Sequence, residues 1–136
     1  MLAIVDTGPV YAAADDDDRN HSNCVELLRR RDLDLVIPAL VVGELTYLIG
    51  SRLGPSADAA FLRGLERLHV ELPAAEDWLR IGDLVDQYSD FPLGGTDASI
   101  VALAERLNTD LIITLDRRHF SAVRPRHCPA FRILPG

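Results

Sequence analysis

The chain has 136 residues, of which 48% are hydrophobic, and a formal net charge of −7. We expect a single globular domain over residues 1–136, long enough to bury a substantial core. The negative charge argues against a protein that binds nucleic acid through a broadly basic surface. No apolar run approaches the ~20 residues that span a bilayer. Asp6 interrupts the apolar start, so we expect no signal peptide, no membrane contact and a cytoplasmic location.

The basic residues argue against several kinds of phosphate chemistry. All 14 residues counted as lysine or arginine are arginines. A P-loop needs a lysine on the nucleotide phosphates. Receiver domains and haloacid-dehalogenase-type phosphatases also place aspartates at strand ends, but they typically use a lysine as well. Cys24 and Cys128 show neither a disulfide framework nor zinc-ligand spacing.

The start of the chain predicts a strand and then a short helix. The apolar run Leu2–Val5 predicts a buried strand that ends at Asp6. Thr7-Gly8-Pro9 predicts a turn into a helix over residues 10–14, because proline suits a helix start. The acidic run 15–18 predicts a solvated loop.

The rest of the chain alternates helices with short apolar strands. The tight helix–strand pair that ends at Asp116 is typical of an α/β domain, which is the predicted fold class. Trp78 is expected in the core or at an interface. The elements expected after residue 18 are helices over 20–31, 39–53, 56–68, 74–88 and 97–107, and strands over 33–37, 69–72, 111–115 and 131–134.

Two acids are predicted to meet at one edge of the sheet. Asp6 and Asp116 each close an apolar strand, and the carboxyl ends of parallel strands share an edge. Open α/β sheets bind ligands beyond that edge. The two carboxylates therefore mark a candidate site.

Two further acids have local reasons to face inward. Glu44 lies four residues from both Leu40 and Leu48, so we expect it along the buried stripe of its helix. There it either binds a metal, lies at the edge of the stripe with its carboxylate in solvent, or pairs with an arginine. Asp97 is expected to open its helix, where it either caps the N-terminus or begins the inward face.

Four convergent carboxylates would repel one another and raise each other's pKa. A hard divalent cation resolves this conflict, because Mg²⁺ and Mn²⁺ prefer carboxylate and water oxygens. Such an ion polarises a phosphoryl oxygen and activates water. The expected substrate is a phosphodiester.

Four motifs occur in the order Asp6-Thr7, Ala39-Leu-Val-Val-Gly-Glu44-Leu45, Thr96-Asp97-Ala98 and Ile113-Thr114-Leu115-Asp116. This order resembles a PIN domain and, more narrowly, the VapC toxins of type II toxin–antitoxin modules. The run from Thr114 to Phe120 is typical of the VapC subgroup. The resemblance covers essentially the whole chain. It implies a three-layer α/β/α sandwich with a central, mostly parallel sheet of four to five strands.

The resemblance also implies an activity: a Mg²⁺- or Mn²⁺-dependent endoribonuclease, inhibited by a VapB-type antitoxin and forming a homodimer. Asp6, Asp97 and Asp116 would hold the metal directly or through water, and Glu44 would complete the acidic site. Thr7 and Thr114 are expected to support these ligands through hydrogen bonds.

Other polar residues near Asp116 leave alternatives open. Arg117 and Arg118 either contact RNA phosphate, neutralise the acidic site or pair with an antitoxin carboxylate. His119 is expected at a helix start or in a loop, with RNA contact as the alternative. A non-catalytic RNA- or protein-binding module is the competing function. A phosphatase acting on small phosphoesters is disfavoured by the missing lysine.

Overall fold

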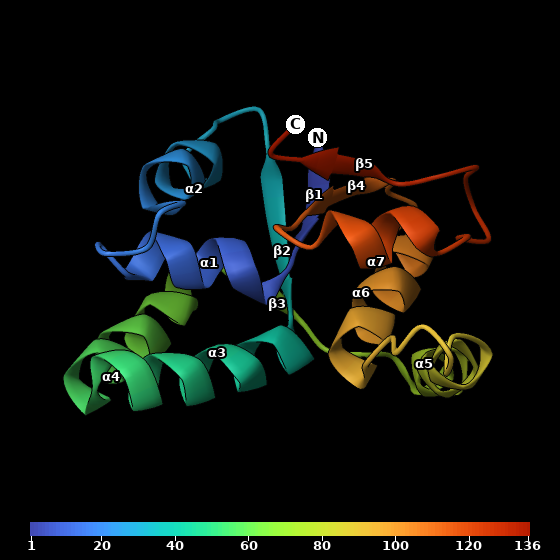
Figure 1. Ribbon diagram of the computed structural model, residues 1–136, viewed down its shortest axis with the longest axis horizontal. Coiled ribbons are helices and arrows are strands. Elements are labelled where there is room, and N and C mark those ends of the chain that lie inside the picture. The colour runs from blue at the N-terminus through green and yellow to red at the C-terminus, as the bar shows by residue number, and fades with distance from the viewer.

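The computed structural model describes residues 1–136 as a five-stranded sheet covered by helices on both faces (Figure 1). The strand order is β3-β2-β1-β4-β5, and every neighbouring pair is parallel. The strands are β1 (Leu2–Val5), β2 (Asp34–Pro38), β3 (His69–Glu71), β4 (Leu111–Ile113) and β5 (Arg132–Leu134). The structure confirms the α/β sandwich, with a sheet that is wholly parallel.

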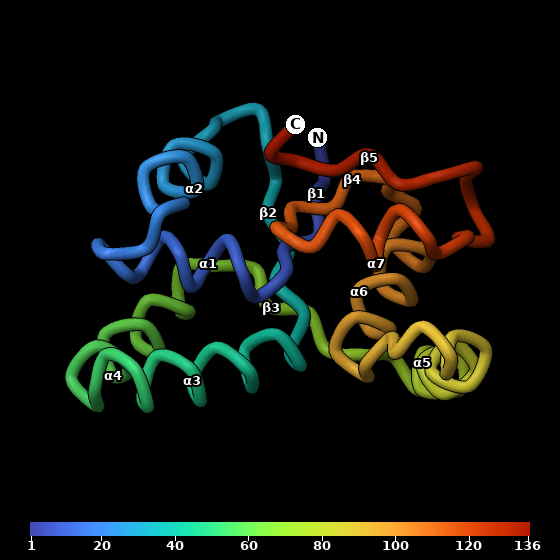
Figure 2. The backbone as a smooth tube through the Cα atoms, in the orientation of Figure 1, coloured from blue at the N-terminus to red at the C-terminus, as the bar shows by residue number.

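Seven α-helices form the two outer layers. Figures 1 and 2 show α1 to α4 on one side of the strands and α5 to α7 on the other. The helices are α1 (Thr7–Ala14), α2 (His21–Leu28), α3 (Ala39–Leu53), α4 (Pro55–Gly64), α5 (Ala75–Gln87), α6 (Gly95–Arg106) and α7 (Arg117–Ala122), and a 3₁₀ turn, η1, spans Leu65–Arg67. None of these helices has the length and apolar character needed to cross a membrane.

The central strands are buried on both faces. Ala3, Ile4 and Val5 of β1 are fully inaccessible to solvent, as are Ile112 and Ile113 of the neighbouring β4. A parallel strand covered by helices on both faces has no solvent side, so its residues form a continuous apolar run. The expectation of two buried strands, each followed by an acid, is confirmed.

The first helix begins three residues earlier than the sequence predicts. Thr7-Gly8-Pro9 forms the first turn of α1, because Asp6 caps the helix by accepting the Thr7 N–H at 2.7 Å. Pro9 fits within this turn, where backbone N–H groups have no partner inside the helix.

Other differences come from packing. The predicted helix over 20–31 ends at Leu28, the one over 56–68 divides into α4 and η1, and the short α7 was not predicted as a helix. Trp78 is 53% exposed, so a place in the core is wrong. α5 packs instead through Asp77, Ile81 and Leu84, and Trp78 lies beside this stripe.

Asp77 joins α5 to its neighbours. One carboxylate oxygen of this buried residue accepts the Ala74 N–H at the start of α5 and the Arg106 Nε–H from α6, both at 2.8 Å. Arg80 and Glu105 form a second, two-pronged pair between the same helices, at 2.8 and 2.9 Å. Together these bonds hold α5 against α6, whose first turn carries Asp97.

Asp77→Ala should lower the free energy of unfolding by about 2–3 kcal/mol, because it removes a helix cap and leaves Arg106 without this carboxylate. Urea denaturation measures the change. Asp83→Ala, at an exposed position of the same helix, is the matched control and should stay within about 0.5 kcal/mol of the parent. Equal losses in both variants would contradict this role for Asp77.

Candidate active site

The acidic site lies at the carboxyl edge of the sheet, as predicted. β1 and β4 pair in parallel with Val5 opposite Ile113, so the next residues, Asp6 and Thr114, leave the sheet side by side. The Asp6 N–H extends the ladder by donating to the Ile113 carbonyl at 2.9 Å. Asp116 follows two residues after Thr114 on the same exit. We call Asp6, Glu44, Asp97 and Asp116 the acidic cluster.

Asp6 is the most buried member, only 8% exposed. Its Oδ1 accepts the Thr7 N–H, and its Oδ2 accepts the Thr114 hydroxyl at 2.7 Å. Burial raises the pKa of Asp6, these two bonds lower it, and the charges of Glu44 and Asp116 raise it further. The carboxylate is therefore fixed in direction and close to other negative charges.

The hydroxyl groups of the two threonines donate to different acids. Thr114 supports Asp6 and also accepts the Asp116 N–H at 2.9 Å, so one hydroxyl connects two members of the cluster. Thr7 uses its backbone on Asp6, but its hydroxyl donates to Glu44 Oε1 at 2.7 Å. Each threonine thus contacts members of the acidic cluster by hydrogen bonds.

Glu44 does not lie on the buried stripe of its helix. That stripe of α3 consists of Val41, Leu45 and Ile49, and Glu44 is exposed beside it. The expectation that Glu44 lies along the buried stripe is wrong, and the alternative of a glutamate at the edge of the stripe agrees with the structure. The Thr7 hydroxyl donates to Glu44 and so connects this exposed carboxylate to the rest of the acidic cluster.

Asp97 is the third residue of α6 and not its first. Gly94 occupies the N-cap position, and no side-chain hydrogen bond caps the helix, so the capping explanation is wrong. Burial, together with the charges of Asp6, Asp116 and Glu44, raises the pKa of Asp97 to about 6, while His119 opposes the rise. Asp97 lies within range of all three other acids.

Asp116 caps α7, with Oδ1 accepting the His119 N–H at 3.1 Å. The His119 ring lies against the other oxygen, with Nδ1 2.7 Å from Oδ2, although the contact does not have hydrogen-bond direction. The same ring packs on Phe91, with centroids 4.8 Å apart. Phe91 carried no signal in the sequence beyond an aromatic residue in a loop.

The donor chemistry fits a hard divalent cation. No group of three or more acidic, histidine or cysteine side chains is arranged to hold an ion unaided. Mg²⁺ usually keeps several waters and uses one or two protein carboxylates. Asp6 and Asp97, whose pKa values are raised by burial and by neighbouring acids, would gain most from such a cation.

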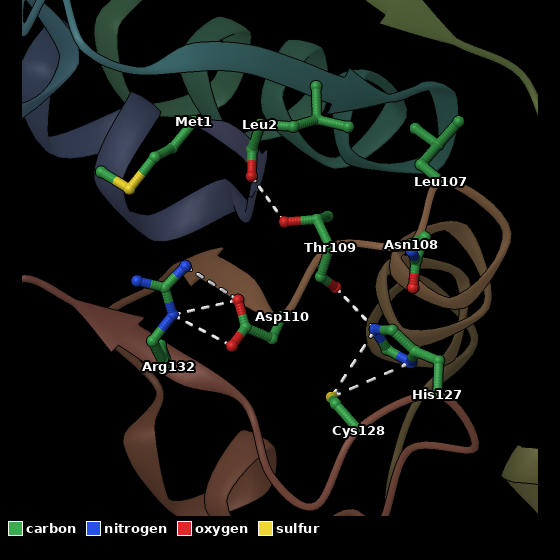
Figure 3. Close-up of a pocket in the computed structure, with 9 residues that line it drawn as sticks. All are labelled: Met1, Leu2, Leu107, Asn108, Thr109, Asp110, His127, Cys128 and Arg132. Atoms are coloured by element: carbon green, nitrogen blue, oxygen red, sulfur yellow. Dashed lines mark hydrogen bonds and ion pairs between the residues drawn. The ribbon is translucent and has the colours of Figure 1, made fainter.

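The largest cavity lies away from the acidic cluster. It measures about 360 Å³ and is lined by Met1 and Leu2 of the N-terminal end, residues 107–110, His127, Cys128 and Arg132. Figure 3 shows the Asp110–Arg132 ion pair and the contact of His127 with the Thr109 carbonyl across it. These residues lie where β1, β4 and β5 begin, at the opposite edge of the sheet.

Comparisons with known proteins agree with this fold and site. Residues 3–124 match the PIN domain family. Ribonuclease VapC26 of Mycobacterium tuberculosis is 37% identical over 134 residues, which is 97% of this chain and 99% of that protein. The chain therefore belongs to the PIN-domain family and, within it, to the VapC proteins.

Two solved structures share the fold. Mycobacterium tuberculosis VapC20, described as a sarcin–ricin loop cleaving toxin, gives a TM-score of 0.74 at 18% identity, over 81% of this chain and 86% of that one. VapBC2 from Rickettsia felis, bound to a DNA fragment of its promoter, gives a TM-score of 0.70 at 20% identity. The match covers 98% of this chain and 97% of that one.

The raised pKa of Asp97 predicts that this residue lowers the stability of the metal-free protein in a pH-dependent way. Its folded-state pKa of about 6 exceeds the ordinary value of 3.8, so the folded state holds the proton longer than the unfolded chain. This contribution to stability falls as pH rises from about 4 to 6 and stays low above that range. In EDTA, Asp97→Asn should stabilise the protein at pH 7.5 by roughly 1 kcal/mol, allowing for solvent screening.

Chemical denaturation of both proteins at pH 4.5 and 7.5 measures this effect. The stability difference should shrink at pH 4.5, and Asp83→Asn should show no such pH dependence. A stabilisation equal at both pH values would contradict a charge origin.

Proposed function

We propose that this protein is a VapC-type toxin, an endoribonuclease that hydrolyses RNA phosphodiester bonds with Mg²⁺ or Mn²⁺. The observation that carries the proposal is the convergence of the acidic cluster at one sheet edge, where burial and the charges of the neighbouring acids raise the pKa of Asp97 to about 6. Such mutual repulsion destabilises the metal-free protein. A bound cation would relieve it and would also attract the anionic phosphodiester. The ribonuclease name of VapC26 supports the same reaction.

Each acid has a distinct part in the proposed reaction. Asp6, Asp97 and Asp116 hold the metal, directly or through water, and the bound metal supplies an activated water and a charge that polarises the phosphoryl group. Thr114 fixes the direction of Asp6, as its 2.7 Å hydrogen bond indicates. Glu44, exposed and anchored by Thr7, is placed to orient water at the rim of the cluster.

The proposed partners are RNA, an antitoxin and a second copy of the chain. The complex of Rickettsia felis VapBC2 supports a VapB-type antitoxin, which would cover the site and restrain the enzyme. Arg117 and Arg118 follow Asp116 on α7 and are exposed, so they are the proposed RNA contacts. A homodimer acting in the cytoplasm completes the proposal.

Loss of either buried or half-buried acid should abolish cleavage. Asp6→Asn and Asp97→Asn each remove one charge from the proposed metal site while keeping side-chain volume. We expect cleavage of total bacterial RNA in MnCl₂ to fall by about 100-fold or more, because metal activation supplies several kcal/mol of transition-state stabilisation. Asp83→Asn is the control and should cleave like the parent protein.

EDTA should abolish RNA cleavage by the parent protein, and added Mn²⁺ should restore the cleavage. Cleavage that persists in a clean Asp97→Asn preparation would exclude this site. RNA binding by the parent without any cleavage in Mg²⁺ or Mn²⁺ would favour the non-catalytic module.

Metal affinity should fall in acid, because the proton on Asp97 competes with the cation. With a pKa of about 6 for Asp97, the Mn²⁺ concentration for half-maximal cleavage should rise as pH is lowered from 7 to 5. Saturating Mn²⁺ should recover most of the rate at pH 5.5. A half-maximal concentration that does not change with pH would show that Asp97 is not the competing group.

A further inference from the structure

Phe91 forms a stacked contact with two side chains of α7. The guanidinium carbon of Arg118 lies over the Phe91 ring, 4.7 Å from its centroid. The His119 ring lies 4.8 Å from the same centroid, tilted by 47°. Phe91 belongs to the loop between α5 and α6. Two consecutive residues of α7 thus hold one aromatic residue of that loop.

This stack borders the acidic cluster. The His119 ring contacts Asp116, with Nδ1 2.7 Å from Oδ2. The loop that carries Phe91 runs three residues further to Gly94, which precedes α6 and its Asp97. An RNA strand with its phosphate at Asp97 and Asp116 would therefore pass close to the stack.

Arg118 is one of two arginines that lie over an aromatic ring, the other being Arg52 over Tyr11. Arg30, Arg80, Arg106 and Arg132 each pair with a carboxylate. Arg117 donates to the Pro135 carbonyl at 3.0 Å. Arg118 is exposed, and its only specific contact is the Phe91 ring. Its guanidinium carbon lies over an aromatic ring, and the side chain as a whole is exposed to solvent.

On the basis of the proposed ribonuclease function, we propose that Arg118, held on Phe91, stacks on an unpaired nucleobase adjacent to the cleaved phosphodiester and sets a base preference there. Guanidinium planes and aromatic rings are the usual platforms for splayed-out RNA bases. A guanidinium already supported on one face by an aromatic ring offers its other face to a second π system. Phe91 is then a positioning residue that orients Arg118.

A phosphate contact would require only the positive charge. Lysine binds phosphate as a point charge, but it lacks the planar surface that a base needs. Arg118→Lys therefore separates the two roles. Phe91→Leu also separates base stacking from phosphate binding. It keeps an apolar side chain in the loop and removes the ring that supports the Arg118 guanidinium.

The first test maps cleavage of a random-sequence pool of 12-nucleotide RNAs in MnCl₂ by sequencing the product ends. The parent protein should prefer particular bases at one position next to the cut. Arg118→Lys and Phe91→Leu should flatten that preference and raise KM at least fivefold, with kcat within twofold. Arg63→Lys, at an exposed position on α4, should change neither. A preference that survives Arg118→Lys would overturn the proposal.

The second test measures binding without cleavage, in the Asp97→Asn background. Fluorescence anisotropy compares the labelled random pool with an abasic ribose-phosphate strand of equal length. Arg118→Lys should weaken binding of the pool five- to tenfold and leave the abasic strand unchanged. Equal losses on both strands would show a phosphate contact and overturn the proposal.

The two tests separate failure of this inference from failure of the proposed function. A parent protein that cuts no RNA in Mn²⁺ contradicts the ribonuclease proposal, while base-dependent binding through Arg118 would still support the stacking role. Circular dichroism melting of Phe91→Leu checks that the fold is retained.

Discussion

The parallel pairing of β1 with β4 is the constraint on which the site depends. Both strands are buried on both faces, and their pairing puts Val5 opposite Ile113. This register sets Asp6 beside Thr114 at the sheet edge. The hydroxyl of Thr114 then joins Asp6 to the backbone of Asp116, so the two strand ends become one structural unit.

Repulsion within the acidic cluster lowers the stability of the folded protein, and the surrounding structure compensates for this loss. Asp97 belongs to the first turn of a helix, where a carboxylate is ordinarily favourable, yet burial and the charges of neighbouring acids raise its pKa to about 6. A group held in an unfavourable protonation environment is typical of a functional position. The bonds of Asp77 and Arg80 to α6 secure the helix that carries this residue.

The sequence predicted the strand-end acids well and the flanking detail poorly. Asp6 and Asp116 follow continuous apolar runs, a pattern that parallel sheets impose directly. Glu44 was misplaced because two apolar rows with a spacing of four residues run side by side along this helix. Glu44 belongs to the row through Leu40, whereas tertiary packing buries the adjacent row through Leu45. Phe91 was missed because its role depends on α7, a helix of six residues with too little periodicity to predict. Local sequence pattern locates the strand ends, whereas contacts between distant segments determine where residues at the edge of the site, such as Glu44 and Phe91, lie.

The same contacts distinguish the members of the cluster as potential ligands. Asp116 already gives one oxygen to the His119 N–H, and its other oxygen faces the His119 ring. Asp97 carries no competing hydrogen bond among the contacts of its side chain, and Asp6 is held in place by its neighbours. Direct ligation by Asp116 would compete with its helix cap, so a water-mediated role disturbs α7 least. Because Arg118 lies on that helix, keeping the cap intact also keeps the Phe91–Arg118 contact beside the acidic cluster.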